Sequence, residues 1–312
     1  MALFQAPILT NGATHPAQQF RMLVRDLARG SEGITQGDDM KVTQRSTPGA
    51  GVSVSDGSAV IKGRANAWQG HYAACNIGTA DVPIASTGGT ARSDMVILRV
   101  KDPDYEGSLN PATAQIDYFD VISNVSSSAT VIPDGSTGIP LARIDLPANT
   151  SVVTNAMITD IRKIANPRRD RTLYTQSPAS LSNLITGVSS LYTAFTTAPG
   201  WNIAIPDWAT SAKIKIDIAG FRMSGGYIFG GLRGKVGPLL TMQPVTIDDD
   251  QGTSTRRMTA VVADTLTIPS LFRGTTQLLR AEFAGGTYNT GSASVDSSTT
   301  FIADVEFEEA PR

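Results

Sequence analysis

The sequence predicts a mainly β protein, with an N-terminal β-sandwich or barrel-like domain that carries one packed α-helix and a C-terminal antiparallel, jelly-roll-like β-sandwich. Its 312 residues exceed what one hydrophobic core usually serves, which favours two domains. Charged residues make up only 17% of the chain, as is typical of turn-rich β proteins. Short runs of β-branched residues, separated by Gly, Pro and Ser turns, recur along most of the sequence.

The first element is a helix at about residues 15–29. Thr14 is a candidate N-cap, Pro16 suits the first turn, and Gly30 can end the helix in a left-handed conformation. An apolar stripe at i, i+3, i+4 and i+7 predicts that the helix packs on its domain through one face. The stripe consists of Phe20, Leu23, Val24 and Leu27.

The rest of the first domain, which we place at residues 1–165, consists of short predicted strands. Turns such as "SDGS", "STGGT" and "PDGSTG" separate them, because glycine and proline supply the conformations that tight turns need. A segment with Ile158, Ile161 and Ile164 is expected to close the domain. The predicted strands cover 40–45, 51–55, 58–62, 70–75, 82–85, 94–101, 115–123 and 140–145.

A domain boundary is predicted at "NPRRDRT", where proline and an exposed charge run coincide. We assign residues 166–172 to a linker and residues 173–312 to the second domain. Helix and strand spacing both fit residues 173–195, and we favour strand.

Strands of the second domain show a period of two. Ile214, Ile216 and Ile218 alternate with polar residues, which is typical of an antiparallel strand with one solvated face. Further strands are predicted at 257–264, 277–284 and 300–309.

Composition argues against several functional classes. A net charge of −2 gives no basic face of the kind that nucleic-acid binding requires. No apolar run approaches the roughly 18 residues of a membrane span, and the N-terminus does not resemble a secretion signal. We therefore expect no nucleic-acid binding, no membrane insertion, and a chain that stays soluble in the cytoplasm where it is made. Cys75 is the only cysteine, so an intrachain disulfide is excluded.

Few residues can support catalysis. Only His15 and His71 offer a base that titrates near neutrality, and His71 lies about 13 Å along a strand from Cys75, too far for direct proton transfer. The glycine-rich stretch at 224–235 lacks the spacing of a phosphate-binding loop and reads as a strand. We expect no catalytic residue, no cofactor and no enzymatic activity.

Two kinds of ligand contact remain open. The turn at Asp248, Asp249 and Asp250 can hold calcium or is a plain solvated hairpin turn; we favour the second and assign no metal site. Exposed aromatic rings can stack on sugars, although most large side chains of a β-sandwich belong to its core or interfaces. The candidates for glycan contact are Trp201, Trp208, Tyr227, Phe229 and Tyr288.

Two stretches resemble a known family. "GGTARSDMVILRVKDPDYEG" at 88–107 is followed by "IPLARIDLPANTSVVTNAMITDIRKIANPR" at 139–168. They resemble the N-terminal domain of minor tail proteins of tailed actinobacterial phages, which are similar to upper-baseplate proteins of long-tailed phages. The resemblance covers roughly residues 10–168, and the C-terminal half matches more loosely through "IPDWATSAKIKIDIAG".

The charged residues of these motifs are expected to form one structural ion-pair network that ties strand ends to the closing segment, since guanidinium groups bridge carboxylates well. The alternative is a set of ordinary exposed charges at strand edges. The residues are Arg92, Asp94, Arg99, Arg143, Asp160 and Arg162.

The resemblance implies a structural virion protein of the phage tail tip or baseplate, made in the host cytoplasm. It also implies a homo-oligomer, with a trimer favoured, and other tail proteins as partners. The apolar "FQAPIL" within residues 1–14 is expected to lie against a neighbouring chain. We expect the C-terminal domain to bind a host-surface glycan as a receptor; the alternatives are a structural spacer or oligomerisation module and, third, a glycan depolymerase with paired carboxylates.

Overall fold

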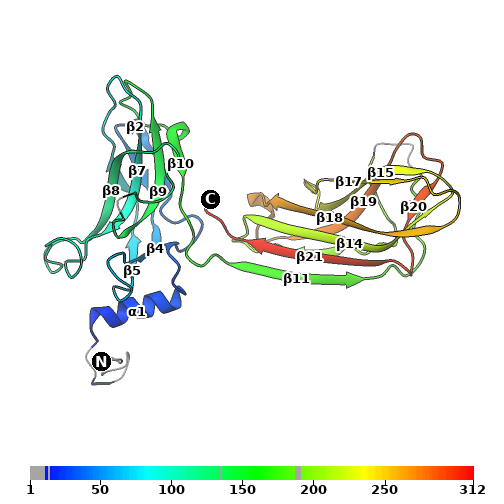
Figure 1. The fold of residues 1–312 in the computed structure, drawn as a ribbon, viewed down its shortest axis with the longest axis horizontal. Helices are drawn as coiled ribbons and strands as arrows, with labels where there is room; N and C mark the ends of the chain where they lie inside the picture. The colour runs from blue at the N-terminus through cyan, green and yellow to red at the C-terminus, as the bar shows by residue number, and fades with distance from the viewer. Residues whose placement is uncertain (1–10, 13–14, 134, 187–190) are drawn as a thin grey trace. The chain divides into compact units, whose positions relative to one another are not determined.

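A computed structural model describes residues 11–12, 15–133, 135–186 and 191–312 and confirms the mainly β fold class. The chain divides into two compact units (Figure 1). The N-terminal unit contains the chain up to Pro167 together with Ala310–Arg312, and the C-terminal unit is Arg168–Glu309. The last three residues therefore belong to the first unit, whereas the sequence-based range assigned them to the second.

The N-terminal unit consists of one helix and ten short strands within its described residues. Nearly all predicted strands are present, with ends shifted by a few residues. The elements are α1 (Ala17–Leu27), β1 (Gly33–Ile34), β2 (Val42–Gly49), β3 (Gly51–Val54), β4 (Gly57–Lys62), β5 (His71–Asn76), β6 (Ala80–Pro83), β7 (Arg92–Val100), β8 (Asp117–Val125), β9 (Gly138–Leu146), a 3-10 turn (Asn155–Met157) and β10 (Ile158–Asp160).

Strand β7 is the centre of this unit. The strands pair in antiparallel sheets of order β1-β4-β5, β2-β3-β6 and β10-β9-β7-β8. Val96 and Leu98 enter the main core with residues of the other two sheets, whereas Met95 and Ile97 enter a smaller cluster on the opposite face. Both faces of β7 are therefore covered, which explains why its sequence is continuously apolar and does not alternate.

The helix packs differently from the prediction. Pro16 is its N-cap without a side-chain hydrogen bond, and the predicted cap Thr14 lies outside the described residues. Gly30 ends the helix with φ 74°, as expected. No residue of α1 is buried, and Phe20 and Leu27 of the apolar stripe are 44% and 72% exposed. Leu23 and Val24 in the middle of the stripe are half-buried, so only part of the stripe contributes to the attachment of the helix.

The C-terminal unit is an antiparallel β-sandwich, as predicted. Its elements are β11 (Arg169–Gln176), β12 (Thr193–Ala194), β13 (Trp201–Ala204), β14 (Ser211–Ser224), β15 (Ile228–Val236), β16 (Leu240–Thr241), β17 (Val245–Asp249), β18 (Arg256–Thr267), a 3-10 turn (Ser270–Phe272), β19 (Thr276–Gly285), β20 (Ser292–Ser294) and β21 (Thr300–Glu308). One sheet has the order β11-β21-β14-β18, with β20 beside β14. The other has the order β12-β19-β15-β16, with β13 beside β19 and β17 beside β15.

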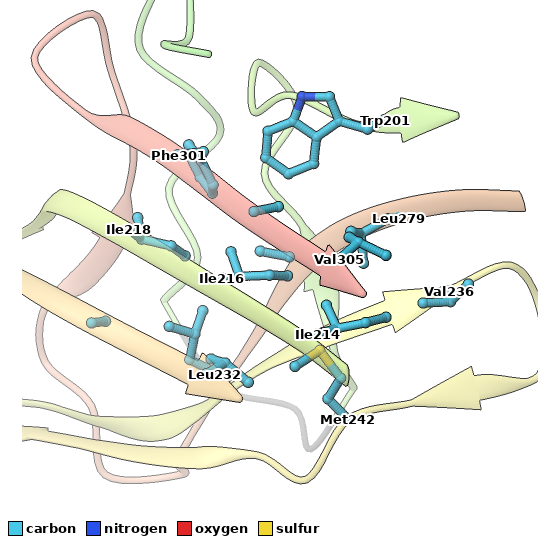
Figure 2. Packing of buried hydrophobic residues seen from close by; sticks show 14 of the residues in the cluster. Trp201, Ile214, Ile216, Ile218, Leu232, Val236, Met242, Leu279, Phe301 and Val305 are labelled. Atoms are coloured by element: carbon cyan, nitrogen blue, oxygen red, sulfur yellow. The ribbon is translucent and has the colours of Figure 1, made fainter. Parts of the chain in front are cut away.

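Alternation along the strands forms the core between these two sheets. Ile214, Ile216 and Ile218 of β14 are at most 2% exposed, and Figure 2 shows them among side chains from neighbouring strands. Phe221 packs against Phe195 and Phe283 with ring centroids 5.9 and 5.8 Å apart. These contacts make one continuous apolar cluster, which is the main stabilising feature of the unit.

The predicted linker is largely a strand. Residues 169–172 belong to β11, which pairs along its whole length with β21. Arg171 forms an ion pair with Asp304 of that strand, and Arg169 lies 3.4 Å from Glu308. The charge run was misread because its partners lie more than 130 residues away, where sequence spacing gives no signal. Residues 177–186 and 191–192, for which we favoured strand, have no regular strand.

The C-terminal tripeptide completes the N-terminal unit. The Arg162 guanidinium, whose side chain is fully buried, donates to the main-chain oxygens of Asp39 (2.5 Å) and Arg312 (3.1 Å). The Arg312 N–H donates to the Gly37 carbonyl at 2.9 Å, and its side chain forms an ion pair with Asp38 at 3.0 Å. Residues from both ends of the chain thus share one set of hydrogen bonds.

His71 gives the N-terminal unit a predicted pH dependence. Its side chain on β5 is 2% exposed. Burial lowers the pKa of His71 below its ordinary value of 6.5, and the nearby Lys62 also lowers it, whereas Glu32 and the Gly30 backbone raise it. The unfolded chain therefore binds more protons near and below pH 6.5, so the free energy of unfolding falls as the pH drops through this range.

We expect H71Q to remove part of this slope. Urea unfolding of both proteins between pH 7.5 and pH 5 measures the free energy of unfolding, and carboxylates that also titrate cancel in the comparison. Equal slopes for the two proteins would contradict a buried, neutral imidazole.

Candidate functional site

The charged residues of the family-like motifs form separate pairs, not the single predicted network. Three of the four pairings join residues two apart on one segment, because such side chains lie on the same face of extended chain. The pairings are Arg92 with Asp94, Arg143 with Asp145, Arg162 with Asp160, and Arg99 with Glu106 and Asp120. One link to the closing segment is present, from Arg143 to the Thr159 hydroxyl at 3.4 Å.

Asp94 is the most buried member of this set, with a fully buried side chain. Its carboxylate accepts two hydrogen bonds of 3.0 Å from the Arg92 Nε–H and one of 3.0 Å from the Asn124 main-chain N–H. Asn124 has φ 58°, and the pairing of β7 with β8 shifts register between Ser93 and Met95. Asp94 therefore fixes an irregular point between two strands, which is a structural role.

A second polar cluster, which sequence analysis missed, attaches helix α1 to its domain. The Arg21 guanidinium lies 5.5 Å from the ring centre of Tyr72 and 5.4 Å from that of Tyr105. Its Nη1 lies 3.1 Å from Asp102 Oδ2, and its Nε–H donates to the Gln69 carbonyl at 2.8 Å. We call Arg21, Gln69, Tyr72, Asp102 and Tyr105 the Arg21 cluster.

The Arg21 cluster is almost closed to solvent. Asp102 is 6% exposed and accepts a hydrogen bond of 2.7 Å from the Tyr72 hydroxyl. Burial, followed by the hydrogen bond to Asp102, raises the pKa of Tyr72, so its hydroxyl stays protonated as a donor. The one sequence signal was the charge of Arg21 within an amphipathic helix; its partners come from two distant segments, 69–72 and 102–105.

We expect Arg21→Ala to lower the free energy of unfolding by about 2 kcal/mol, because it removes a charged hydrogen-bonding group from a buried carboxylate. Hydrogen exchange should rise most in α1, since no buried apolar side chain holds that helix. Arg25→Ala is the matched control, because Arg25 contacts only Asp26 among the interactions described here and is 35% exposed. A similar loss for both variants would contradict the assigned role of Arg21.

Two of the five aromatic candidates pack against the core of the sandwich. Trp201 is 8% exposed, belongs to the sandwich core and packs on Tyr174 with ring centroids 5.8 Å apart. Trp208 is partly buried beside the same core, with the Arg168 guanidinium 5.2 Å from its ring centre. Both residues serve packing, so the expectation of glycan contact fails for them.

The other three candidates lie on two segments that are hydrogen-bonded to each other. Tyr227 and Phe229 are two residues apart at the start of β15, and Tyr288 lies in the turn after β19. The segments are joined by hydrogen bonds from the Phe229 N–H to Asn289 Oδ1 (2.7 Å) and from the Gly286 N–H to the Phe229 carbonyl (2.7 Å). Phe229 is 44% exposed and Tyr288 is 86% exposed. We call Tyr227, Phe229 and Tyr288 the outer aromatic patch.

Carboxylates border the outer aromatic patch. Asp248 of β17 lies opposite Phe229 in the strand register. Desolvation and the neighbouring Asp248 raise the pKa of Tyr227, so its hydroxyl remains a hydrogen-bond donor at neutral pH. The adjacent loop is held by Arg256, which pairs with Asp249 and donates to the Gly226 carbonyl at 2.7 Å. An aromatic surface with fixed acceptors can stack on and hydrogen-bond to a sugar.

The aspartate turn is partly used by this loop. Asp249 is committed to Arg256, so it is not a free calcium ligand beside Asp248 and Asp250. Within the described residues, no three His, Cys, Asp or Glu side chains gather in a way that could hold a metal ion. Among the described helices, none has the length and apolar character needed to cross a bilayer.

No protein-family model and no curated protein matches this sequence. Comparison with solved structures finds infectious bursal disease virus VP2 in a subviral particle, with a TM-score of 0.24, 14% identity and coverage of 96% of this chain and 88% of that one. The structure of the Gx strain of the same virus gives a TM-score of 0.26, 13% identity and coverage of 90% and 79%. The structure of BuGH86 in complex with neoagarooctaose gives a TM-score of 0.24 and 11% identity, with coverage of 86% of this chain and 34% of that one. TM-scores this low support no functional argument.

Proposed function

We propose that this chain is a structural virion protein of a phage tail tip or baseplate whose C-terminal unit binds a host-surface glycan. The tail location is supported by the family-like motifs, whose charged residues, such as Asp94, are committed to ion pairs within the fold. Glycan binding is supported by the outer aromatic patch, whose three aromatic residues lie on hydrogen-bonded neighbouring segments, with the side chains of Phe229 and Tyr288 exposed. We propose further that the protein acts as a homo-oligomer in which copies meet through a three-fold contact, and that it has no catalytic activity.

A glycan array with the full chain tests the binding function. We expect the combined variant Y227A, F229A and Y288A to bind on the order of 100-fold more weakly, since each ring contributes about 1 kcal/mol. Trp68→Ala is the matched control, because Trp68 is 64% exposed and belongs to the N-terminal unit. Binding that survives the triple variant would refute the patch as the receptor site.

The second candidate is a structural spacer or oligomerisation module at the same location. It is favoured by the solvent-facing side of the sheet β11-β21-β14-β18. There, oppositely charged side chains form pairs, as in Lys213 with Glu308 and Lys215 with Asp217. Absence of binding to any host-surface glycan or host cell would support it. Sugar release that disappears when one of two facing carboxylates is changed to an amide would support the third alternative, a depolymerase.

A further inference from the structure

Strand β18 is an open sheet edge. It is the last strand of the sheet β11-β21-β14-β18, and no strand among the described residues pairs with its outer side. The Ile268 N–H donates to the Thr210 carbonyl on the β14 side at 2.9 Å, so even-numbered residues direct their main-chain groups towards β14. The main-chain groups of Thr259, Val261 and Ala263 therefore point away from the sheet, and these residues are exposed.

The two edges of this sheet differ in their protection. Edge strand β11 begins with Arg169, Asp170 and Arg171, and charges at an edge oppose pairing with another strand. Strand β18 also begins with two charges, Arg256 and Arg257, which form ion pairs with Asp249 and Asp296. The residues that follow, 258–263, contain no charge and no proline, and Val261 is 43% exposed. An edge of this length without such protection is a template for another strand.

We propose that β18 pairs in antiparallel fashion with β18 of a second copy of this chain, around a two-fold axis at Val261. Because the outward-facing residues are odd-numbered, an antiparallel self-pairing must be centred on a residue and not between two residues, and Val261 is the middle one of the three outward-facing residues in the uncharged segment. With Val261 opposite its counterpart, Thr259 lies opposite Ala263 of the partner copy. Three residues of each strand then form about six main-chain hydrogen bonds.

Charge favours this self-pairing. In the proposed register Arg257 lies opposite Thr265 of the second copy, and Met258 lies opposite Asp264, so no like charges face each other. A parallel arrangement would align Arg257 with Arg257 and Asp264 with Asp264. Only the antiparallel register avoids contacts between like charges, which supports a second copy of the chain as the partner.

The proposed β18 pairing goes beyond the proposed function, because it limits the number of chains that the homo-oligomer can contain. A two-fold contact joins chains in pairs, so the assembly contains an even number of copies. If the expected three-fold contact exists elsewhere in the molecule, the two contacts together give six copies.

Light scattering of the full chain in solution tests the pairing through the particle mass. We expect a dimer or a hexamer for the natural sequence, and we expect V261K to halve the mass because two ammonium groups would face each other at the axis. T175K is the matched control: Thr175 is exposed on the opposite edge strand, and its variant should leave the mass unchanged.

A second variant guards against misfolding. Val261→Pro removes an N–H that points away from β14, so the ladder within the sheet is kept while the pairing is lost. Circular dichroism checks that each variant is folded. A monomer or trimer for the natural sequence, an unchanged mass for both Val261 variants when folded, or an equal loss with T175K would each overturn the proposal.

Discussion

We expect Asp94→Ala to lower the free energy of unfolding of the N-terminal unit by about 3 to 5 kcal/mol, because it leaves a guanidinium and a main-chain N–H without their buried acceptor. Asp94 is fully buried, and the Arg92 side chain is 21% exposed. The Asn124 N–H at the irregular point opposite β7 loses its acceptor as well. Urea unfolding measures the loss, and hydrogen exchange of β7 and β8 assigns it to this unit.

Asp145→Ala is the matched control for Asp94. Both aspartates accept hydrogen bonds from an arginine two residues away, but the Asp145 side chain is 41% exposed. Its hydrogen bonds with Arg143 lower the pKa of Asp145, and solvent screening limits what such a pair contributes, so we expect a loss of at most about 1 kcal/mol. If Asp94→Ala lost glycan binding while its stability stayed unchanged, the structural role of these charges would be wrong.

In the C-terminal unit, we expect Glu282→Ala to cost about 3 to 5 kcal/mol, because three cationic side chains surround one buried carboxylate. Glu282 lies 3.0 Å from Arg233, 2.8 Å from Arg280 and 4.0 Å from Lys235, and its side chain is 2% exposed. Tyr192 covers this cluster, with the Arg233 guanidinium 3.8 Å from its ring centre. Without the Glu282 carboxylate, the positive charges of the two arginines and the lysine lie close together with no buried anion between them.

Glu306→Ala is the control for this prediction. Glu306 lies on the outer face of the other sheet, is 24% exposed and is 3.8 Å from Arg169. We expect its loss to change the free energy of unfolding by at most about 1 kcal/mol. Trp201 fluorescence and hydrogen exchange of β15 and β19 report the unfolding of this unit, and equal effects for the two variants would argue against a special role for Glu282.

The strands could be predicted because the spacing of apolar residues along a strand shows which of its faces is buried. The alternation of Ile214, Ile216 and Ile218 identified a strand with one solvated face. The apolar run of β7 identified a strand, and the structure shows that both of its faces are covered. Short-range pairs two residues apart were also readable in principle, since any extended segment brings such charges together. The error was to join them into one network.

Long-range polar contacts could not be predicted. The periodicity of helix α1 identified its apolar stripe but not the direction in which that stripe points, because Arg21 binds residues from two distant segments. Likewise, nothing local distinguishes the buried Trp201 from the exposed Tyr288. Their difference arises from strand pairing, which places one ring against the core and the other on a turn.

The hydrogen bond from Arg162 to the Arg312 carbonyl spans 150 residues of chain and has a consequence for biosynthesis. A ribosome releases residues 310–312 only after the entire intervening sandwich has been made, so the first unit emerges early but reaches its final set of contacts late. During that interval the Arg162 guanidinium lacks one acceptor, and the nascent chain depends on the sandwich folding promptly to bring its end back.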